Sequence, residues 1–181
     1  MDGNSTVRVG VLGYGNVGAA VVALIAENGD TIAARTGLRL EVVRVAVRDM
    51  RKAREGFTGV TDDAAGVVVD PEVDLIVEVI GGLEPAKDLV LAALKAGKPV
   101  VTANKELMAA YGAELFDAAA KAGVDLLFEA AVAGAIPLIR PLRESLAGDR
   151  IKRVLGIVNG TTNFILTRMT ESGQTFAEAL A

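Results

Sequence analysis

Apolar residues along the first two thirds of the chain form two patterns that alternate with each other. Short runs of consecutive apolar residues are typical of parallel-sheet strands, because such strands are buried on both faces. We expect strands over residues 7–12, 40–47, 73–80, 99–103 and 125–130. Longer stretches with helical spacing lie between some of these runs, over residues 17–26, 86–96 and 107–122.

This alternation predicts an α/β fold, in which right-handed crossovers build a doubly wound parallel sheet. Glycines mark the expected helix ends. Gly97 and Gly123 follow the second and third helices, and Asn28-Gly29 ends the first. Residues 31–36 either prolong the first helix or form a short second one.

The pattern changes after Pro137, where a second domain is expected to begin. The remaining sequence predicts a helix, a strand and a helix over residues 138–146, 151–158 and 164–170. Thr175 and Glu178 then form a capping-box pattern that announces another helix. We therefore expect a domain over residues 1–137, followed over residues 138–181 by the truncated start of a second α+β domain.

Composition narrows the chemistry that these residues can perform. Apolar residues make up 51% of the 181 residues but aromatic residues only 4%, so the core must be aliphatic. The chain has no Cys and no His, which excludes thiolate catalysis, Cys/His zinc sites and imidazole acid–base chemistry. A net charge of -4, without a basic stripe, argues against general binding to nucleic acid or anionic membranes.

An uncharged stretch over residues 9–26 is long enough to cross a membrane. Three glycines within residues 13–18 interrupt it where a spanning helix would be continuous. A signal peptide also fits poorly, because an acidic residue, Asp2, precedes the lone Arg8. We expect a soluble, cytoplasmic protein that makes no membrane contact.

A phosphate-binding pattern follows the first expected strand and opens the first expected helix. Its residues are Gly13, Tyr14, Gly15, Asn16, Val17 and Gly18, which together form G-x-G-x-x-G. Gly13 permits a tight turn, Gly15 permits close approach of a diphosphate, and Gly18 permits close packing of helix and strand. In this context the pattern predicts a Rossmann domain that binds a nicotinamide dinucleotide, although a purely structural glycine turn stays an alternative.

Charged residues after the second strand bear on the choice of dinucleotide. Arg48 is suited to paired contacts with a 2′-phosphate, and Lys52 adds a second positive charge. This favours NADP or tolerance of both cofactors, whereas Asp49 keeps NAD open because an acid near this point holds the ribose hydroxyls. Lys52 is equally compatible with a solvated loop.

Two further candidates, Gly81 and Lys105, fall at the carboxyl ends of expected strands. In a doubly wound sheet this edge binds the ligand. Surface lysines are common, so Lys105 alone does not establish a function.

Four segments make a more specific pattern. They are Glu-Val-Ile-Gly-Gly at 78–82, Thr-Ala-Asn-Lys at 102–105, Phe-Glu-Ala-Ala-Val-Ala-Gly-Ala-Ile-Pro at 128–137 and Gly-Ile-Val-Asn-Gly-Thr-Thr-Asn-Phe-Ile-Leu at 156–166. In order and spacing, the chain resembles the homoserine dehydrogenase family over nearly its whole length. The resemblance implies an oxidoreductase that interconverts L-homoserine and L-aspartate 4-semialdehyde with NAD or NADP, in threonine and methionine biosynthesis.

The resemblance also assigns roles to individual residues. Lys105 matches the family lysine beside substrate and nicotinamide, where it would polarise the aldehyde oxygen and stabilise the developing alkoxide. Gly160 and Thr161 match positions that contact the amino-acid substrate, although Asn-Gly also makes simple tight turns.

A monovalent cation site, for an ion such as sodium, is implied by a further four matches. They are Glu129, Val132, Gly134 and Ile136. A close-packed connection without a cation fits these residues equally well. Ala135 departs from the family pattern, since many members carry glycine there, and this puts the local backbone geometry in question.

The family's second lysine and its ammonium-binding acids have no match in the chain, so we expect dinucleotide binding with little or no turnover. Residues 156–166 resemble a dimer-forming region, which implies a homo-oligomer at full length. Two other interpretations stay open: another Rossmann oxidoreductase acting on a carbonyl or imine, and a non-enzymatic NAD(P)-sensing regulatory module. Aspartate-semialdehyde dehydrogenase is disfavoured, because its acyl chemistry needs a cysteine.

Overall fold

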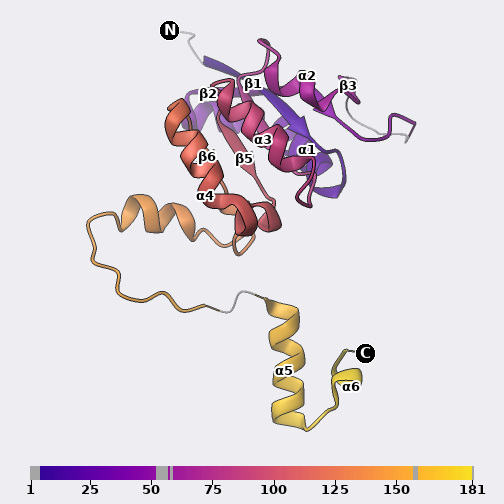
Figure 1. Ribbon diagram of the computed structural model, residues 1–181, viewed down its shortest axis with the longest axis vertical. Coiled ribbons are helices and arrows are strands. Elements are labelled where there is room, and N and C mark those ends of the chain that lie inside the picture. Colours follow the sequence, from indigo (N-terminus) through magenta and orange to yellow (C-terminus); the bar gives the residue numbers. More distant parts are fainter. Residues whose placement is uncertain (1–4, 52–56, 58, 157–158, 181) are drawn as a thin grey trace. The chain divides into compact units, whose positions relative to one another are not determined.

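The chain folds into two compact units, Met1–Ile139 and Arg140–Ala181 (Figure 1). The structure is a computed structural model that describes residues 5–51, 57, 59–156 and 159–180.

The first unit is built on a parallel sheet with strand order β3-β2-β1-β4-β5-β6. Its strands are β1 (Ser5–Leu12), β2 (Leu38–Ala46), β3 (Val60–Thr61), β4 (Leu75–Glu78), β5 (Val100–Thr102) and β6 (Leu126–Leu127). The chain winds outward from β1 on one side and outward from β4 on the other. The expected doubly wound Rossmann sheet is thereby confirmed, with its topological switch point between β1 and β4.

Strand register brings four carboxyl ends level at this switch point. Leu12, the last residue of β1, lies opposite Ala46 on one side and Glu78 on the other. Glu78 in turn lies opposite Thr102. The loops that leave β1, β2, β4 and β5 therefore start from one edge of the sheet.

Helices cover the two faces of the sheet unequally. On one face, α1 (Asn16–Thr36) packs on a cluster that contains Val11, Val45 and Val77. On the other face lie α2 (Ala64–Val69), α3 (Ala86–Lys95) and α4 (Lys105–Ala122), over a cluster that contains Leu12 and Ile76. Alternate residues along each strand thus enter opposite cores, as the pleat requires.

The first helix is longer than Asn28-Gly29 predicts, so that expected end is wrong and the prolonged alternative is correct. Asn28 donates a hydrogen bond to the carbonyl of Leu24, 3.2 Å away, and so stays within the helical pattern. Gly29 lies on the buried side, and α1 ends only at Gly37, whose φ is 74°. Gly97 and Gly123 follow α3 and α4 with positive φ, as expected.

By length and composition, α1 is the one helix in the described part of the chain that could span a membrane. Its buried residues nevertheless recur every three or four positions: Gly18, Val22, Ile25, Gly29 and Ala33. This stripe faces the sheet between β1 and β2, so α1 is the first crossover helix of the Rossmann fold.

The sequence patterns missed β3 and α2, which lie between residues 60 and 69. The strand β3 has only two residues, too few to show a periodicity. The short helix α2 is capped by Asp63, whose carboxylate accepts a hydrogen bond from the Gly66 amide at 2.7 Å. Both elements are defined by contacts with neighbours more than by a local pattern.

The remaining elements are helical. A 3-10 turn (Glu129–Ala131) follows β6, so the strand expected over residues 125–130 is shorter than predicted. The second unit contains a π-helical turn (Pro141–Ser145), α5 (Gly160–Ser172) and α6 (Phe176–Leu180). The expected capping box of α6 is confirmed, because the Glu178 carboxylate accepts from the Thr175 amide at 2.8 Å and Thr175 Oγ1 accepts from the Glu178 amide at 3.4 Å.

The strand expected over residues 151–158 is wrong for residues 151–156, and residues 157–158 lie outside the described residues. A strand needs a neighbour to satisfy its backbone groups. In the described part of the second unit no strand is present to pair with it. Its apolar side chains are accordingly exposed, and Leu155 retains 83% of its accessible surface.

Ion pairs tie the amino edge of the sheet together. The Arg8 guanidinium donates to both carboxylate oxygens of Asp74, at 2.7 and 2.9 Å. These bonds, with one from the Arg8 amide at 2.8 Å, lower the pKa of Asp74 to about 2. Nearby, Lys98 is buried and donates to the Asp70 carbonyl, and desolvation lowers its pKa.

We predict that Asp74 makes the fold acid-sensitive between about pH 4 and pH 2. Its folded pKa is depressed from an ordinary 3.8 to about 2, so its stabilising effect is complete above the ordinary value and is lost as the pH falls through the lower one. Asp74→Asn should lower the melting temperature by a few degrees at pH 7 and should flatten the acid limb of the stability curve. Melting curves across this pH range test the prediction.

The control is Asp125→Asn, an exposed carboxylate before β6 that forms no ion pair with any described residue. It should leave the acid limb unchanged. If the melting temperatures of the wild type and the Asp74 variant fall equally between about pH 4 and pH 2, Asp74 is not the source of the acid sensitivity.

Candidate functional site

The glycine turn after β1 lies between the ends of β2 and β4. Gly13 has a φ of 102°, which favours glycine. Its amide donates to the Ala46 carbonyl at 2.9 Å, and a Cβ at this position would lie 2.9 Å from the Val79 carbonyl oxygen. Only glycine therefore fits between the two strand ends.

The first turn of α1 packs directly on this loop. A Cβ on Gly18 would lie 2.0 Å from the Gly13 carbonyl oxygen, well inside contact distance. The carbonyl oxygen belongs to the backbone, and the position of a Cβ is fixed by the backbone, so no side-chain movement could relieve that overlap. Gly18 thus fixes the close approach of helix and loop that the sequence predicts.

Gly15 differs from these two glycines, because space is open beside it. It caps α1 with an ordinary φ of -82°, and a Cβ there would meet no described atom within 4 Å. No side chain caps the helix, and its first turn carries no acid. The amides of Asn16, Val17 and Gly18 thus begin a helix of 21 residues beside open space.

This arrangement suits a phosphate anion. Free amides and the positive end of the helix dipole attract negative charge, and the missing side chain at Gly15 lets the anion approach the backbone. Asn16 and Val17 are exposed, whereas Tyr14 packs against the core on the α1 side of the sheet. The residues present therefore fit the diphosphate of a dinucleotide.

An exposed cation follows the end of β2, near this turn. Arg48 is exposed and forms no ion pair with any described residue. Asp49, by contrast, accepts from the Arg51 amide at 3.0 Å and from its guanidinium at 3.1 Å. The carboxylate that would favour NAD is thus already engaged by a cation. Lys52 lies outside the described residues.

The loops after β4 and β5 are joined through a buried carboxylate. Glu78 is fully buried, and its Oε1 accepts from the Ile80 amide at 2.8 Å and from the Gly81 amide at 3.4 Å. Its Oε2 accepts from the Thr102 hydroxyl at 2.6 Å. One side chain therefore holds the ends of two strands.

Asn104 continues this network to the start of α4. Its side-chain amide donates to the Gly82 carbonyl at 2.6 Å, and its Oδ1 caps α4 by accepting from the Leu107 amide at 3.1 Å. Lys105, the first residue of α4, is exposed. A cation is disfavoured at this helix end, so its presence here suggests a role other than helix stability.

Comparison with known proteins identifies the family. The sequence model described as "Homoserine dehydrogenase, NAD binding domain" matches residues 13–129, and the one described as "Homoserine dehydrogenase" matches residues 137–181. The chain belongs to the homoserine dehydrogenase family. The resemblance predicted from the four sequence segments is thus confirmed.

Named relatives and solved structures agree with this assignment. The homoserine dehydrogenase of Corynebacterium glutamicum is 56% identical over 98% of this chain, and that of Bacillus subtilis is 46% identical over 96%. The crystal structure of a homoserine dehydrogenase from Thiobacillus denitrificans superposes with a TM-score of 0.90 at 48% identity over 97% of this chain. A hyperthermophilic archaeal homoserine dehydrogenase in complex with NADPH matches 97% of this chain with a TM-score of 0.77 at 28% identity.

The matched proteins are longer than this chain. It spans 40% of the Corynebacterium protein, 41% of the Bacillus protein and 41% of the Thiobacillus structure. It spans 59% of the chain in the archaeal structure.

The segment expected to bind a cation in this family forms a closed loop. Glu129 Oε1 accepts from the amides of Leu138 and Ile139, at 2.5 and 2.9 Å. Between these ends, Ala133 and Ala135 have positive φ values of 51° and 66°. Ala135 thus adopts the left-handed conformation that glycine favours, which answers the question raised by its departure from the family pattern.

The other residues of the expected cation site lie in this loop as well. Val132, Gly134 and Ile136 are partly or fully exposed. No group of three acidic side chains suited to a metal ion occurs in the described ranges. Any cation here would therefore rely on backbone carbonyls, as the resemblance implies.

The two expected substrate residues lie in the second unit. Gly160 and Thr161 form the first turn of α5, which Asn159 caps by accepting from the Thr162 amide at 2.8 Å. The tight Asn-Gly turn considered as an alternative is therefore replaced by a helix start. Their contact with a substrate stays a prediction.

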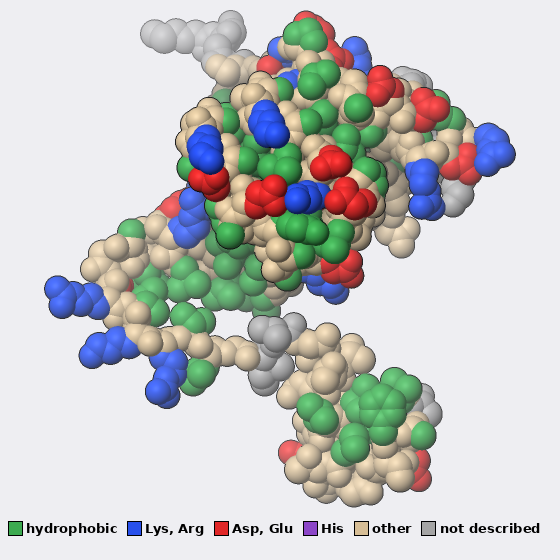
Figure 2. All heavy atoms as spheres, viewed as in Figure 1, with side chains coloured by type: hydrophobic (Ala, Val, Ile, Leu, Met, Phe, Trp, Pro, Cys, Tyr) green, Lys and Arg blue, Asp and Glu red, His purple; other side chains and the backbone are tan. Residues whose placement is uncertain are grey.

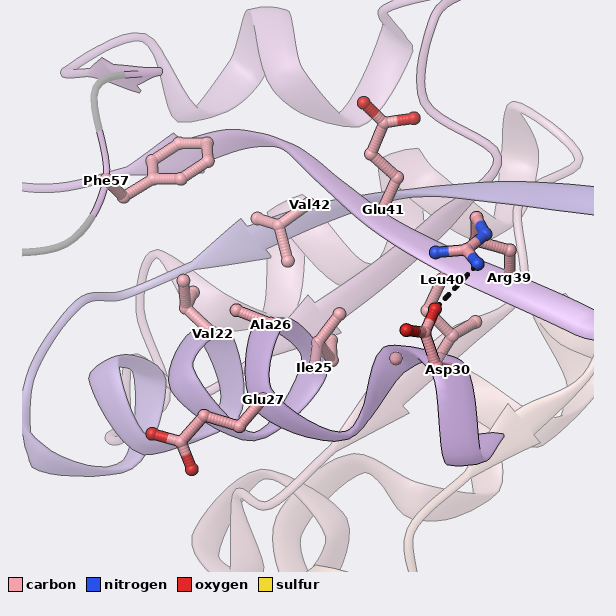
Figure 3. Close-up of a pocket in the computed structure, with 11 residues that line it drawn as sticks. Val22, Ile25, Ala26, Glu27, Asp30, Arg39, Leu40, Glu41, Val42 and Phe57 are labelled. Atoms are coloured by element: carbon pink, nitrogen blue, oxygen red, sulfur yellow. Dashed lines mark hydrogen bonds and ion pairs between the residues drawn. The ribbon is translucent and has the colours of Figure 1, made fainter. Parts of the chain in front are cut away.

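A separate hollow of about 450 Å³ lies away from this edge, between the middle of α1 and the first half of β2 (Figure 3). Apolar side chains such as Val22, Ile25 and Phe57 line it, and an Arg39–Asp30 pair at 2.8 Å stands at its rim. The strand β3 pairs with Val45–Ala46, so no described strand lies beside the first half of β2 on its outer side. The hollow reflects this short edge strand and contains none of the candidate residues.

The sequence predictions missed the network of Glu78, Thr102 and Asn104 as site residues. A signal was present, because an acid that follows a run of apolar strand residues is unusual in a buried strand. The sequence could not show which groups satisfy that acid. Thr102 lies on β5, which only the folded sheet brings beside β4, and the bonds from Ile80 and Gly81 depend on the turn after β4.

Proposed function

We propose that the chain binds a nicotinamide dinucleotide and supplies the cofactor-binding part of a homoserine dehydrogenase, which interconverts L-homoserine and L-aspartate 4-semialdehyde. The observation that carries this proposal is the uncapped start of α1 beside the open space at Gly15, within residues that match the family's NAD-binding domain. NADPH is the ligand of the archaeal structural relative. When bound, the dinucleotide donates or accepts the hydride.

The residues of the chain perform the other tasks. The amides at the start of α1 hold the diphosphate, and the loop at Gly81 borders the dinucleotide at the switch point. The Lys105 ammonium donates a hydrogen bond to the substrate oxygen and stabilises the negative charge that develops there. Its place at the sheet edge, fixed through Asn104 and Gly82, supports this role.

We propose NADP as the preferred dinucleotide. Arg48 offers a guanidinium that no described acid engages, and a 2′-phosphate is its natural partner. The Asp49–Arg51 pair lowers the repulsion that a free Asp49 carboxylate would exert on this phosphate.

Further proposals concern ions and partners. The loop between Glu129 and Ile139 would hold a monovalent cation such as sodium, through the backbone carbonyls of its expected ligands, Glu129, Val132, Gly134 and Ile136. The second unit would begin the substrate and dimerisation domain, with Gly160 and Thr161 near the amino-acid substrate.

The surface of the second unit supports a homo-oligomer. Apolar side chains gather on the unit formed by α5 and α6 (Figure 2), where Phe164, Leu166 and Phe176 are each more than half exposed. On the first unit, Lys and Arg side chains in the same view are interspersed with Asp and Glu. With the biosynthetic role of the family, these features support a soluble, cytoplasmic enzyme.

We predict that Arg48→Ala lowers the affinity for NADPH by about tenfold and that for NADH by less than about twofold, because it removes one charge-assisted contact to the 2′-phosphate. Titration calorimetry of the 181-residue chain measures both constants. The matched control is Arg39→Ala, an exposed arginine at the other end of β2, which should change neither. An unchanged NADPH preference in the Arg48 variant refutes the 2′-phosphate contact, and a wild-type chain that binds neither dinucleotide refutes the proposed function.

We also predict that the chain can replace its counterpart in an active relative. A chimera in which these 181 residues substitute for the matched part of the 56% identical Corynebacterium protein should oxidise L-homoserine within about tenfold of the relative's rate. Lys105→Met in this chimera should reduce the rate by about 100-fold, because one preorganised charge at the reacting oxygen is lost. Formation of reduced dinucleotide, followed by absorbance, measures the rates.

The control substitution is Lys95→Met, at the end of α3, which should have no effect. A folded chimera without activity, or a Lys105 variant with the full rate, would contradict the proposal.

A further inference from the structure

Glu78 is the one fully buried acid in the described part of the chain, and neither the fold nor the proposed chemistry requires an acid there. It forms no ion pair with a described Lys or Arg. Burying a carboxylate without a countercharge is costly unless hydrogen bonds compensate. Its hydrogen bonds must therefore offset the cost of its burial.

The two carboxylate oxygens serve different loops. Oε1 accepts from the amides of Ile80 and Gly81, in the loop that leaves β4. Oε2 accepts from the Thr102 hydroxyl at the end of β5, 2.6 Å away. Glu78 therefore sets the position of one loop relative to the next.

Two hydrogen bonds donated by Asn104 close this arrangement into a ring. Thr102 Oγ1 accepts from the Asn104 amide at 3.0 Å, and Asn104 donates back to the Gly82 carbonyl at 2.6 Å. Gly81 and Gly82 both have positive φ, 79° and 72°. Because both residues are glycines, this part of the loop has no side chains that could fix its shape. The ring therefore substitutes for side-chain packing at this edge.

We propose that Glu78 is a positioning residue, which acts through Thr102 and Asn104 to place the Gly81-Gly82 backbone and Lys105 against the nicotinamide half of the dinucleotide. This inference rests on the proposed function. The diphosphate and adenosine halves are held by α1 and by the end of β2, and none of the ring's hydrogen bonds reaches a residue of either element. Loss of the ring should thus affect one half of the ligand selectively.

The chemistry of the ring makes Glu78→Gln a specific test. A glutamine can accept from the two loop amides through its oxygen, but its nitrogen must then donate to Thr102 Oγ1. That hydroxyl would already accept from Asn104, so its own hydrogen would be left buried without an acceptor. The side-chain volume is kept, while the hydrogen bond between β4 and β5 is reversed and weakened by the unpaired hydroxyl hydrogen.

Binding of two ligands to the 181-residue chain distinguishes positioning from general stability. The ligands are NADPH and 2′-phospho-ADP-ribose, which lacks only the nicotinamide. Glu78→Gln should weaken NADPH binding by about tenfold and should change 2′-phospho-ADP-ribose binding by less than about twofold. The emission maximum of bound NADPH should also move, because it reports the surroundings of the nicotinamide.

The matched control is Asp74→Asn, the same change of carboxylate to amide at the residue directly before β4. It should lower stability but leave the ratio of the two affinities unchanged. Thr102→Val and Thr102→Ser form a second pair, which serves if Glu78→Gln fails to fold. The valine variant removes the hydroxyl and should lose NADPH affinity selectively, whereas the serine variant should retain it.

If Glu78→Gln leaves the ratio of the two affinities unchanged, whether both affinities fall equally or neither falls, the role of Glu78 is overturned and the proposed function stays intact. A wild-type chain that binds neither ligand would overturn both. A selective loss of NADPH binding in Glu78→Gln or Thr102→Val, with Thr102→Ser retaining it, supports the inference.

Discussion

The contact between the first turn of α1 and the loop that precedes it constrains most of this molecule. A methyl group on Gly18 would overlap the Gly13 carbonyl at 2.0 Å, so helix and strand meet as closely as their backbones permit. This contact aims the start of α1 at the edge where four strands end level. The amides at that point have no side-chain cap and face open space at Gly15. A site for an anion follows from the packing.

The remaining parts of the site are arranged around the same edge by register and by hydrogen bonds. Leu12 stands level with Ala46 and with Glu78, so the loops that carry Arg48 and Gly81 leave the sheet on either side of the glycine turn. The ring through Glu78, Thr102 and Asn104 extends this order to Lys105. The residue proposed to bind the 2′-phosphate, Arg48, and the residue proposed to polarise the substrate, Lys105, thus follow strands on opposite sides of the glycine turn.

Much of the fold could be predicted because its strands are apolar on both faces and its helices end at glycines. The family could be predicted because the segments at 128–137 and 156–166, the latter with Asn-Gly-Thr-Thr-Asn, are distinctive. Predictions failed where local sequence and tertiary contacts disagree. Asn28-Gly29 did not end α1, since the Asn28 side chain bonds back to Leu24 and Gly29 packs on the buried side. The strand over residues 151–156 did not form, and no other strand occurs in the described part of the second unit to pair with it.

The proposed function depends most directly on where the diphosphate binds, and amide chemical shifts report this residue by residue. In a titration of the isotopically labelled 181-residue chain with NADPH, the amides of Gly15, Asn16, Val17 and Gly18 should show the largest shifts of the first unit. Their nitrogens lie at the proposed contact, and the bound anion would accept their hydrogen bonds. If saturating NADPH leaves the chemical shifts of these amides unchanged while those of other residues change, the diphosphate does not bind at the start of α1.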